Sequence, residues 1–136
     1  MNEKCIFCKI IAGEIPSDKI YEDDSVLAFM DIRPVGRGHV LVLPKKHTAD
    51  LLSADDEILR DLMPKVKRIG VAAMEAVNAQ AINISTNNGA ASGQIIFHLH
   101  FHLIPRFSND NLFPWPHHES EPQTRAEIAK KIKENL

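Results

Sequence analysis

Three histidines alternate with large apolar side chains in one stretch of the chain, Phe97-His98-Leu99-His100-Phe101-His102-Leu103-Ile104-Pro105. Successive side chains of a strand point to opposite faces, so the alternation predicts one apolar face and one face of imidazoles. The residues expected to be buried are Phe97, Leu99, Phe101 and Leu103. The imidazoles expected to project together, with neighbours roughly 6.5–7 Å apart, are those of His98, His100 and His102. Pro105 is expected to end the strand pairing.

A face of three imidazoles indicates chemistry more than packing. Imidazole is not favoured in strands, whereas near neutral pH it acts as nucleophile, general acid or base, and metal ligand. The middle histidine, His100, can attack a phosphorus or acyl centre if a hydrogen bond holds its other ring nitrogen. Its neighbours would then donate hydrogen bonds to the charge that develops on a phosphoryl group. Metal binding is the competing use of the same face.

Length and composition predict a single domain with a small partner. A chain of 136 residues, 44 % of them apolar, can build one core. The net charge of −2 gives no general basic field, which argues against nonspecific binding to nucleic acid but not against a small anionic substrate. No apolar run approaches the roughly 20 residues of a membrane helix, and the N-terminus lacks a secretory pattern. We therefore expect a cytoplasmic protein with neither a nucleic acid nor a membrane as partner.

Two cysteines, Cys5 and Cys8, have the Cys-x-x-Cys spacing of either a redox dithiol or half a zinc site. Two cysteines cannot close a tetrahedral zinc site, and the common Cys2His2 set needs two imidazoles besides. His47, after one apolar strand, and His98, at the start of the histidine stretch, are candidates. The spacing alone leaves both uses of the cysteines open.

The remaining pattern predicts a mixture of strands and helices. A continuous apolar run at 39–43 indicates a central strand covered on both faces. Behind an apparent capping box at 53–56, apolar residues recur at helical spacing, interrupted by Pro64, which removes one backbone hydrogen bond. The C-terminal helix has a thin apolar stripe, which predicts packing against the domain or a partner subunit. The expected elements are strands at 20–22, 26–30, 39–43, 81–85 and 97–104, a long helix at 54–78, and short helices near 5–13 and 124–135.

A small, polar loop with two glycines, Thr86 to Gln94, leads into the histidine stretch. Such a loop is either an ordinary connection between strands or a source of backbone N–H groups for an anion. Composition favours the ordinary connection. Its position directly before the imidazoles favours the anion.

Taken together, these residues resemble the histidine-triad (HIT) family of nucleotide-binding hydrolases and transferases. The family motif, His-x-His-x-His and two apolar residues, matches 98–104, and the similarity extends over 5–16 and 38–47. It is greatest to the nucleoside-phosphoramidate (HINT-like) branch and to bacterial zinc-containing Hit proteins. The resemblance implies an α+β fold with about five antiparallel strands, one long helix and short helices, paired as a two-fold homodimer. The single domain 1–136 would comprise a core at 5–107 and a C-terminal extension at 108–136.

The resemblance also implies a reaction at a purine nucleotide. His100 would attack the α-phosphorus and form a nucleotidyl-histidine that water hydrolyses, with the P–N bond of a nucleoside phosphoramidate as the expected target. The implied catalytic set is His98, His100 and His102. The implied nucleotide-binding set is Phe7, Ile10, Phe29, Asp31, Ile32, His39, Leu41, Asn87, Gly93, Gln94, Ile95, His100 and His102. Within it, Gln94 and His102 would contact the phosphate, and Asp31 the ribose.

For the cysteines, the resemblance implies a structural zinc held by Cys5, Cys8, His47 and His98. Four protein ligands leave no open position on the metal, so it would brace the fold while the chemistry stays with His100. One position departs from the family pattern, because Ile95 stands where a serine or threonine usually serves the phosphate or the leaving group. The alternatives are a dinucleoside polyphosphate hydrolase and a non-enzymatic nucleotide-binding or interaction protein.

Overall fold

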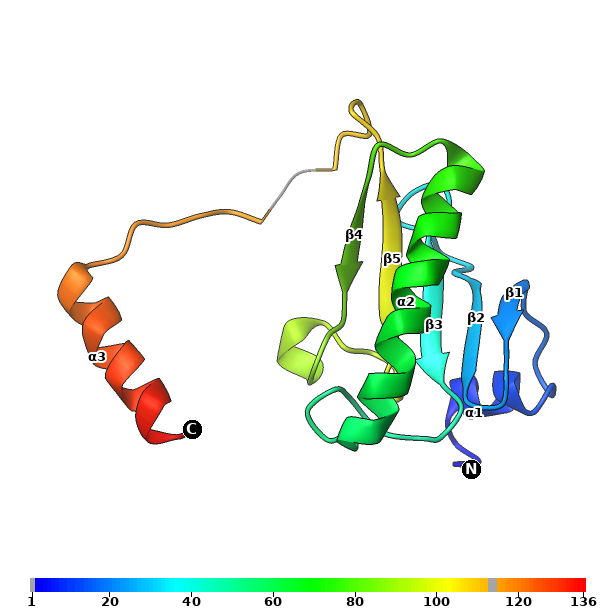
Figure 1. Cartoon of the computed structure of the whole chain (residues 1–136), viewed down its shortest axis with the longest axis horizontal. Helices are drawn as coiled ribbons and strands as arrows, with labels where there is room; N and C mark the ends of the chain where they lie inside the picture. The colour runs from blue at the N-terminus through cyan, green and yellow to red at the C-terminus, as the bar shows by residue number, and fades with distance from the viewer. Residues whose placement is uncertain (1, 113–114) are drawn as a thin grey trace.

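The computed structural model describes residues 2–112 and 115–136 and has an open, five-stranded antiparallel sheet with helices on both faces (Figure 1). The sheet order is β1-β2-β3-β5-β4. The elements are α1 (Ile6–Ile11), β1 (Lys19–Glu22), β2 (Val26–Met30), β3 (Val40–Pro44), α2 (Asp56–Val77), β4 (Ala81–Ser85), the 3-10 helix η1 (Ala90–Ser92), β5 (Phe101–Arg106) and α3 (Pro122–Glu134). The predicted α+β fold is confirmed.

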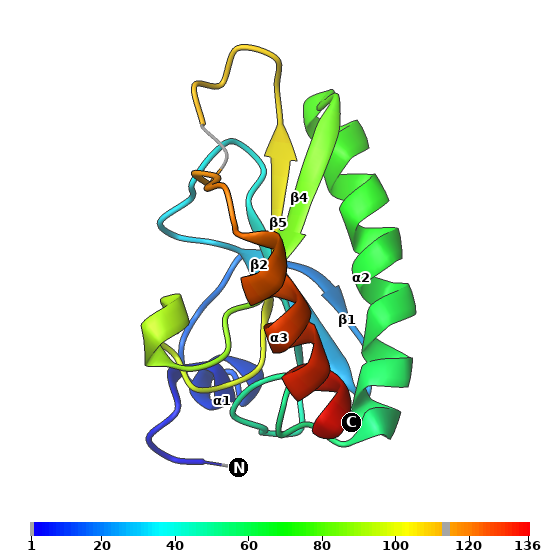
Figure 2. The same cartoon turned by 90° about the vertical axis from the view of Figure 1, so that its left-hand side faces the viewer.

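The sheet separates two apolar layers. The long helix α2 covers one face, and α1 and η1 lie on the other (Figure 2). The strand β3 has its alternate side chains in both layers: Val40 and Val42 belong to the α2 core, and Leu41 and Leu43 to the α1 core. All four side chains are buried. The predicted central strand, covered on both faces, is confirmed.

The histidine stretch begins as a loop and only then joins the sheet. β5 starts at Phe101, later than the predicted start at Phe97, and the predicted end of pairing at Pro105 is wrong, because Pro105 and Arg106 still pair with β4. Before it, the chain is held by a loop contact, in which the Leu99 N–H donates to the Thr48 carbonyl at 2.7 Å. The expected burial is correct for Leu99, Phe101 and Leu103. It is wrong for Phe97, which is 48 % exposed because the chain has not yet reached the core under α2.

The long helix α2 matches the predicted one, but its start differs. Asp55 is the N-cap and makes no capping hydrogen bond with its side chain. The capping box is therefore wrong: the hydroxyl of Ser53 donates to the Asp50 carboxylate at 2.8 Å instead. Pro64 lies inside the helix, which continues past it as one element. The residues of α2 that are buried against the sheet are Leu62, Val66, Ile69, Gly70 and Ala73.

The C-terminal helix α3 forms where the sequence predicts it, but it stands away from its own domain (Figure 1). Every residue from 115 to 136 is exposed. Packing of α3 against its own domain is thus wrong for this structure, and packing against a partner subunit stays a prediction. In the part of the chain that the structure describes, no helix combines the length and apolarity needed to cross a membrane.

Candidate active site and metal site

A cavity of about 460 Å³ opens on the α1 side of the sheet and brings most of the predicted site together. Every residue of the predicted nucleotide-binding set lines it except His39 and Gln94. One wall is apolar, with the rings of Phe7 and Phe29 in edge contact at 5.7 Å between centroids. The polar part of the lining includes His100, His102 and Asp31, and the centroid of the His100 ring lies 5.0 Å from that of Phe7. The cavity thus offers an apolar slot beside a pair of imidazoles, which suits a flat base with a charged tail.

Several lining residues were not predicted from the sequence. They come from α1, from the segment between α1 and β1, and from the ends of two loops: Ile6, Ile15, Pro16, Ser17, Arg33 and Ile96. Arg33 follows the predicted ribose contact Asp31, and its backbone N–H donates to the Asp31 carboxylate at 2.8 Å. A basic residue next to a predicted ligand was the available sequence signal. The other five have no local pattern that separates them from core residues.

The backbone fixes which nitrogen of His100 carries a proton. Nδ1 lies 2.6 Å from the carbonyl oxygen of His98, which can only accept, so Nδ1–H donates and Nε2 has a free lone pair. Burial lowers the pKa of His100, although the hydrogen bond to His98 acts in the opposite direction. The imidazole is therefore neutral near pH 7. A neutral imidazole with one nitrogen held and the other free has the form of a nucleophile.

A second hydrogen-bonded chain fixes the proton of His102. The Val35 N–H donates to Nδ1 of His39 at 3.0 Å, so His39 carries its proton on Nε2. That nitrogen lies 2.9 Å from Nδ1 of His102, which accepts and must therefore keep its own proton on Nε2. Asp31 lies at 3.5 Å from the same His39 nitrogen. We call Asp31, His39, His100 and His102 the reactive group.

A second cluster of side chains, which includes His98, has the chemistry of a metal site. We call Cys5, Cys8, His47 and His98 the metal group, and one ligand atom of each lies within 4.8 Å of every other. The two Nδ1 atoms are 3.2 Å apart, and Cys8 Sγ lies 3.4 Å from His47 Nδ1 and 3.6 Å from His98 Nδ1. Tetrahedral zinc with Zn–N near 2.0 Å and Zn–S near 2.3 Å requires about 3.3 Å between nitrogens and about 3.6 Å between nitrogen and sulfur.

The tautomer of His98 also fits a cation. Its Nε2 lies 2.7 Å from the Pro44 carbonyl and donates to it, so the lone pair of Nδ1 faces the two sulfurs. Burial is the main cause that lowers the pKa of His98 to about 4, with the neighbouring His47 and His100 as smaller causes. His98 is therefore a neutral ligand. The donor set and its spacing fit zinc, and with all four positions filled the metal would be structural.

The glycine-containing loop takes its shape from Gln94. Its side chain is buried, its amide donates to the carbonyls of Ala49 and Ile96, and its oxygen accepts from the Gly89 N–H at 2.8 Å. All of these contacts are within the protein, so in this structure Gln94 supports the loop from behind. The predicted contact of Gln94 with phosphate stays a prediction. Ile95, the next residue, lines the exposed part of the cavity and is 88 % exposed.

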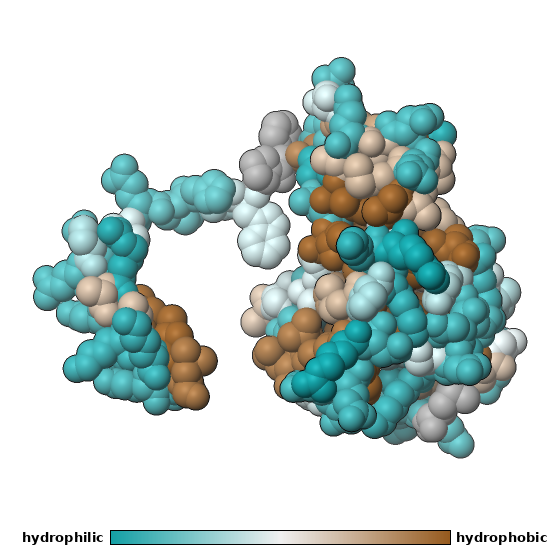
Figure 3. Space-filling view, viewed as in Figure 1, coloured by the Kyte–Doolittle hydropathy of each residue, from teal (hydrophilic) through white to brown (hydrophobic). Residues whose placement is uncertain are grey.

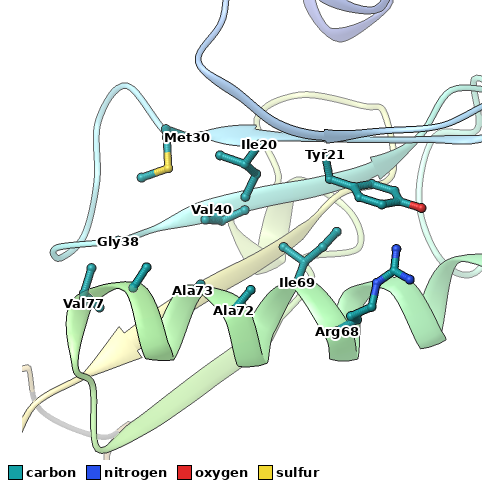
Figure 4. Close-up of a pocket in the computed structure, with 11 residues that line it drawn as sticks. Ile20, Tyr21, Met30, Gly38, Val40, Arg68, Ile69, Ala72, Ala73 and Val77 are labelled. Carbon is teal, nitrogen blue, oxygen red and sulfur yellow. The ribbon is translucent and has the colours of Figure 1, made fainter.

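A second, smaller cavity of about 330 Å³ lies on the opposite face of the sheet, between α2 and the first three strands (Figure 4). Its walls are almost wholly apolar, and at one end the Arg68 guanidinium carbon stands 5.2 Å from the centre of the Tyr21 ring. It contains no histidine, cysteine or carboxylate. Because the first cavity alone of these two is lined by histidines and a carboxylate, it is the candidate active site.

The open antiparallel sheet and the neutral, oriented histidine beside a largely apolar cavity place this chain in a class of α+β proteins with a histidine-dependent site. The HIT domain matches residues 12–109, and this chain belongs to the HIT family.

Three relatives illustrate the range of the family. The adenosine 5'-monophosphoramidase HNT1 of Candida albicans is 38 % identical over 141 residues, which span 99 % of this chain and 93 % of that one. The crystal structure of SMU.412c from Streptococcus mutans superposes with a TM-score of 0.94 at 38 % identity, covering 99 % of this chain and 87 % of that chain. A zinc-bound histidine triad family protein from Mycobacterium smegmatis gives a TM-score of 0.77 at 37 % identity, with 96 % of each chain covered.

Proposed function

We propose that this protein is a nucleotide hydrolase or nucleotidyl transferase that acts at the α-phosphate of purine nucleotides. The P–N bond of a nucleoside phosphoramidate is its proposed target. The observation that carries the proposal is the oriented imidazole of His100: Nδ1–H is held by the His98 carbonyl, and the free Nε2 belongs to a residue that lines the cavity. The relative from Candida albicans, named an adenosine 5'-monophosphoramidase, supports the same reaction.

The base and the sugar would lie along the apolar side of the cavity. Phe7, Ile10, Phe29, Ile32 and Leu41 would enclose the purine, and Asp31 would accept a hydrogen bond from the ribose. Asn87 and Gly93, at the two ends of the loop, line the same cavity and would flank the phosphate. In this arrangement, the α-phosphorus lies next to His100. Binding energy from the buried base then holds the phosphorus in position for attack.

In the proposed reaction, Nε2 of His100 forms a bond to the α-phosphorus as the P–N bond breaks. The amine departs as a neutral molecule because the substrate enters with its P–N nitrogen protonated, and the Nε2–H of His102, whose tautomer is set through His39 and Val35, donates a hydrogen bond to a phosphoryl oxygen. Water then attacks the phosphorus, the bond to His100 breaks, and the proton from water passes to solvent. AMP and the amine are the products. Charge on the phosphoryl oxygens is stabilised by the imidazole N–H of His102 and the loop amides.

In this proposal, the metal group stabilises the active site without taking part in the reaction. Zinc bound there would supply no open coordination position, so it would hold α1, the turn after β3 and His98 together. The same residue His98 provides the carbonyl that orients His100. The zinc-bound relative from Mycobacterium smegmatis supports this metal. A two-fold homodimer and a cytoplasmic location complete the proposal and stay predictions.

The test is AMP release from adenosine 5'-phosphoramidate and, in parallel, from a diadenosine polyphosphate, by the intact protein and by His100→Ala. We expect faster cleavage of the phosphoramidate and a loss of at least about 10⁴-fold in the variant. Nucleotide binding should persist in His100→Ala, because the apolar wall is intact. Faster cleavage of the polyphosphate would favour a dinucleoside polyphosphate hydrolase. Binding without turnover of either substrate would identify a non-enzymatic nucleotide-binding protein, and full activity of the variant would refute the role of His100.

A further inference from the structure

One buried hydroxyl group, that of Ser17 between α1 and β1, has no partner in the protein. Of the buried side-chain nitrogen and oxygen atoms in residues 2–112 and 115–136, its Oγ alone makes no hydrogen bond. A buried polar atom without a bond costs folding free energy, so it calls for an explanation when a native fold retains it. Ser17 lines the candidate active-site cavity. The missing partner is therefore expected on a molecule bound there.

The unpartnered hydroxyl is more informative than the exposed apolar surface of the molecule. The apolar stripe of α3 faces open space (Figure 3), and its Ile128 and Ile132 are 52 % and 57 % exposed. Apolar contact has no direction, so such a stripe does not indicate the chemistry of what covers it. A hydroxyl, in contrast, requires a donor or an acceptor within about 3 Å. Ser17 therefore restricts the chemistry of the bound molecule at one point of the cavity.

Strand pairing places Ser17 at the end of the cavity remote from the imidazoles. His102 pairs with Leu41, and Leu41 pairs with Phe29, so three neighbouring strands contribute one lining residue each. Neighbouring strands lie about 4.8 Å apart, which gives about 10 Å from β5 to β2. The segment that holds Ser17 leads into β1, beyond β2 in the sheet, and the carbonyl of Asp18 accepts a hydrogen bond from the last residue of β2 at 3.0 Å.

A purine nucleotide that lies along this line presents its base to Ser17. In the proposed function, the α-phosphorus lies next to His100 and the ribose contacts Asp31, so the base extends toward the far end of the cavity. The atoms of a purine most remote from the sugar are N1 and the substituent on C6. The lining residues directly before Ser17, Ile15 and Pro16, are apolar and offer no hydrogen-bonding side chain. The hydroxyl is thus the group that can meet the C6 substituent.

We propose that Ser17 determines the base specificity of the site through a hydrogen bond between its hydroxyl and the substituent on purine C6. The inference rests on the proposed function, whose nucleotide cavity it uses. A hydroxyl both donates and accepts, so it can accept from the 6-amino group of adenine or donate to the 6-oxo group of guanine. Because the Oγ, although closed to solvent, has no bond to lose, it can turn between staggered rotamers toward the base. The site then prefers purines with a hydrogen-bonding substituent on C6 over unsubstituted purine.

A cycle of two changes, one in the protein and one in the ligand, tests this contact. The ligands are AMP and purine riboside 5'-monophosphate, which differ only by the 6-amino group. Their dissociation constants are measured by isothermal titration calorimetry with the intact protein and with Ser17→Ala. We expect the intact protein to bind AMP about tenfold more tightly, and Ser17→Ala to bind the two ligands equally, as for the loss of one hydrogen bond. An unchanged ratio of the two constants in Ser17→Ala would overturn the proposal, and so would an intact protein without a preference for AMP.

The matched control is Ser92→Ala, because the Ser92 hydroxyl donates to the Gly89 carbonyl at 2.8 Å and the residue lies outside the cavity lining. It should keep the preference for AMP. With the 5'-phosphoramidates of adenosine and purine riboside as substrates, Ser17→Ala should raise KM for the first about tenfold at unchanged kcat, since the base contact is the same in the ground state and the transition state. Equal losses for both substrates would mean that Ser17 only shapes the cavity, and would overturn the proposal. AMP release by the intact protein tests the proposed function separately, whatever the ratio of the constants.

Discussion

The metal group and the reactive group consist of similar side chains and differ in what the backbone does to their imidazoles. In each, the polar atoms of at least three ligand-type side chains lie within 4.8 Å of one another. In the metal group, a carbonyl accepts from His98, so the lone pair of Nδ1 faces the cysteines. In the reactive group, the Val35 N–H donates to His39, so Nε2 carries a proton toward His102. The backbone partner thus determines whether clustered imidazoles suit a cation or form a hydrogen-bonded chain.

This difference argues against a metal in the reactive group, although its composition of two imidazoles and a carboxylate would permit one. A cation at Nε2 of His39 would have to displace the proton that the Val35 contact places there. In the metal group, His98 already presents the lone pair of its Nδ1 to the other ligand atoms. The two groups nevertheless meet in one residue: the side chain of His98 belongs to the metal group, and its carbonyl orients His100.

Removal of the metal is expected to have the largest effect. We predict that Cys8→Ser lowers the zinc content well below one per chain and the melting temperature by about 10 °C or more, because a structural zinc site contributes folding free energy directly. Zinc is measured by elemental analysis and unfolding by circular dichroism. AMP release should fall as well, since His98 would no longer be held.

The control for that experiment is His100→Ala, which changes the reactive group alone. It should retain its zinc and its melting temperature within about 3 °C while losing turnover. A Cys8→Ser protein as stable as the wild type would show that the four side chains do not form a structural metal site.

The second prediction concerns a variant that removes a hydrogen bond within the reactive group and leaves the metal group intact. His39→Leu removes the N–H that holds His102, and we expect kcat to fall about ten- to a hundred-fold, as for a lost hydrogen bond of ~1.5–3 kcal/mol. His39→Gln retains an amide donor and should recover part of the loss. Zinc content should not change in either variant. Equal rates for Leu and Gln would mean that His39 acts through packing rather than through its proton.

The sequence was informative wherever a pattern is local. The alternation at β3 predicts its two covered faces, and the spacing of apolar residues predicts α2. The burial of Phe97 failed because it depends on contacts with distant segments, whereas the capping by Ser53 failed because its hydroxyl bonds Asp50, three residues earlier, instead. The orientation of His39 was beyond reach for another reason: the backbone amide of Val35 donates to it only in the particular turn that the chain forms before β3.

The candidate site shows the same division. The resemblance to the HIT family supplied most of the cavity lining, because a motif preserves residue identity and order. It did not indicate that Gln94 is turned inward, with all its polar atoms bonded to the backbone. Nor did it predict that Ile95 is nearly free of contacts at the mouth. Side-chain direction in a loop depends on what surrounds it, which a motif does not record.

The third prediction concerns that exposed isoleucine. Ile95 is 88 % exposed at the cavity mouth, so Ile95→Ser should leave the free energy of unfolding and the zinc content unchanged. The new hydroxyl can donate to the phosphate or the leaving group, and we expect kcat/KM for the phosphoramidate to rise about tenfold. Ile95→Ala serves as the control, because it shortens the side chain without adding a donor. The same increase in both variants would mean that the isoleucine merely obstructs the mouth.

The smallest expected effect is that of mild acid on the rate. Burial is the main cause that lowers the pKa of His102 to about 4, and burial also lowers the pKa of His100. Protonation of His100 would remove its nucleophilic lone pair, so a lowered pKa moves the acid limb of the kcat profile below pH 6.5. Between pH 7.5 and 6.0, we therefore expect kcat to fall by less than the about fourfold that a histidine of ordinary pKa would lose. A fall of kcat with a midpoint near pH 6.5 would mean that His100 is exposed to solvent during turnover. Burial would then not control the protonation of the reactive group.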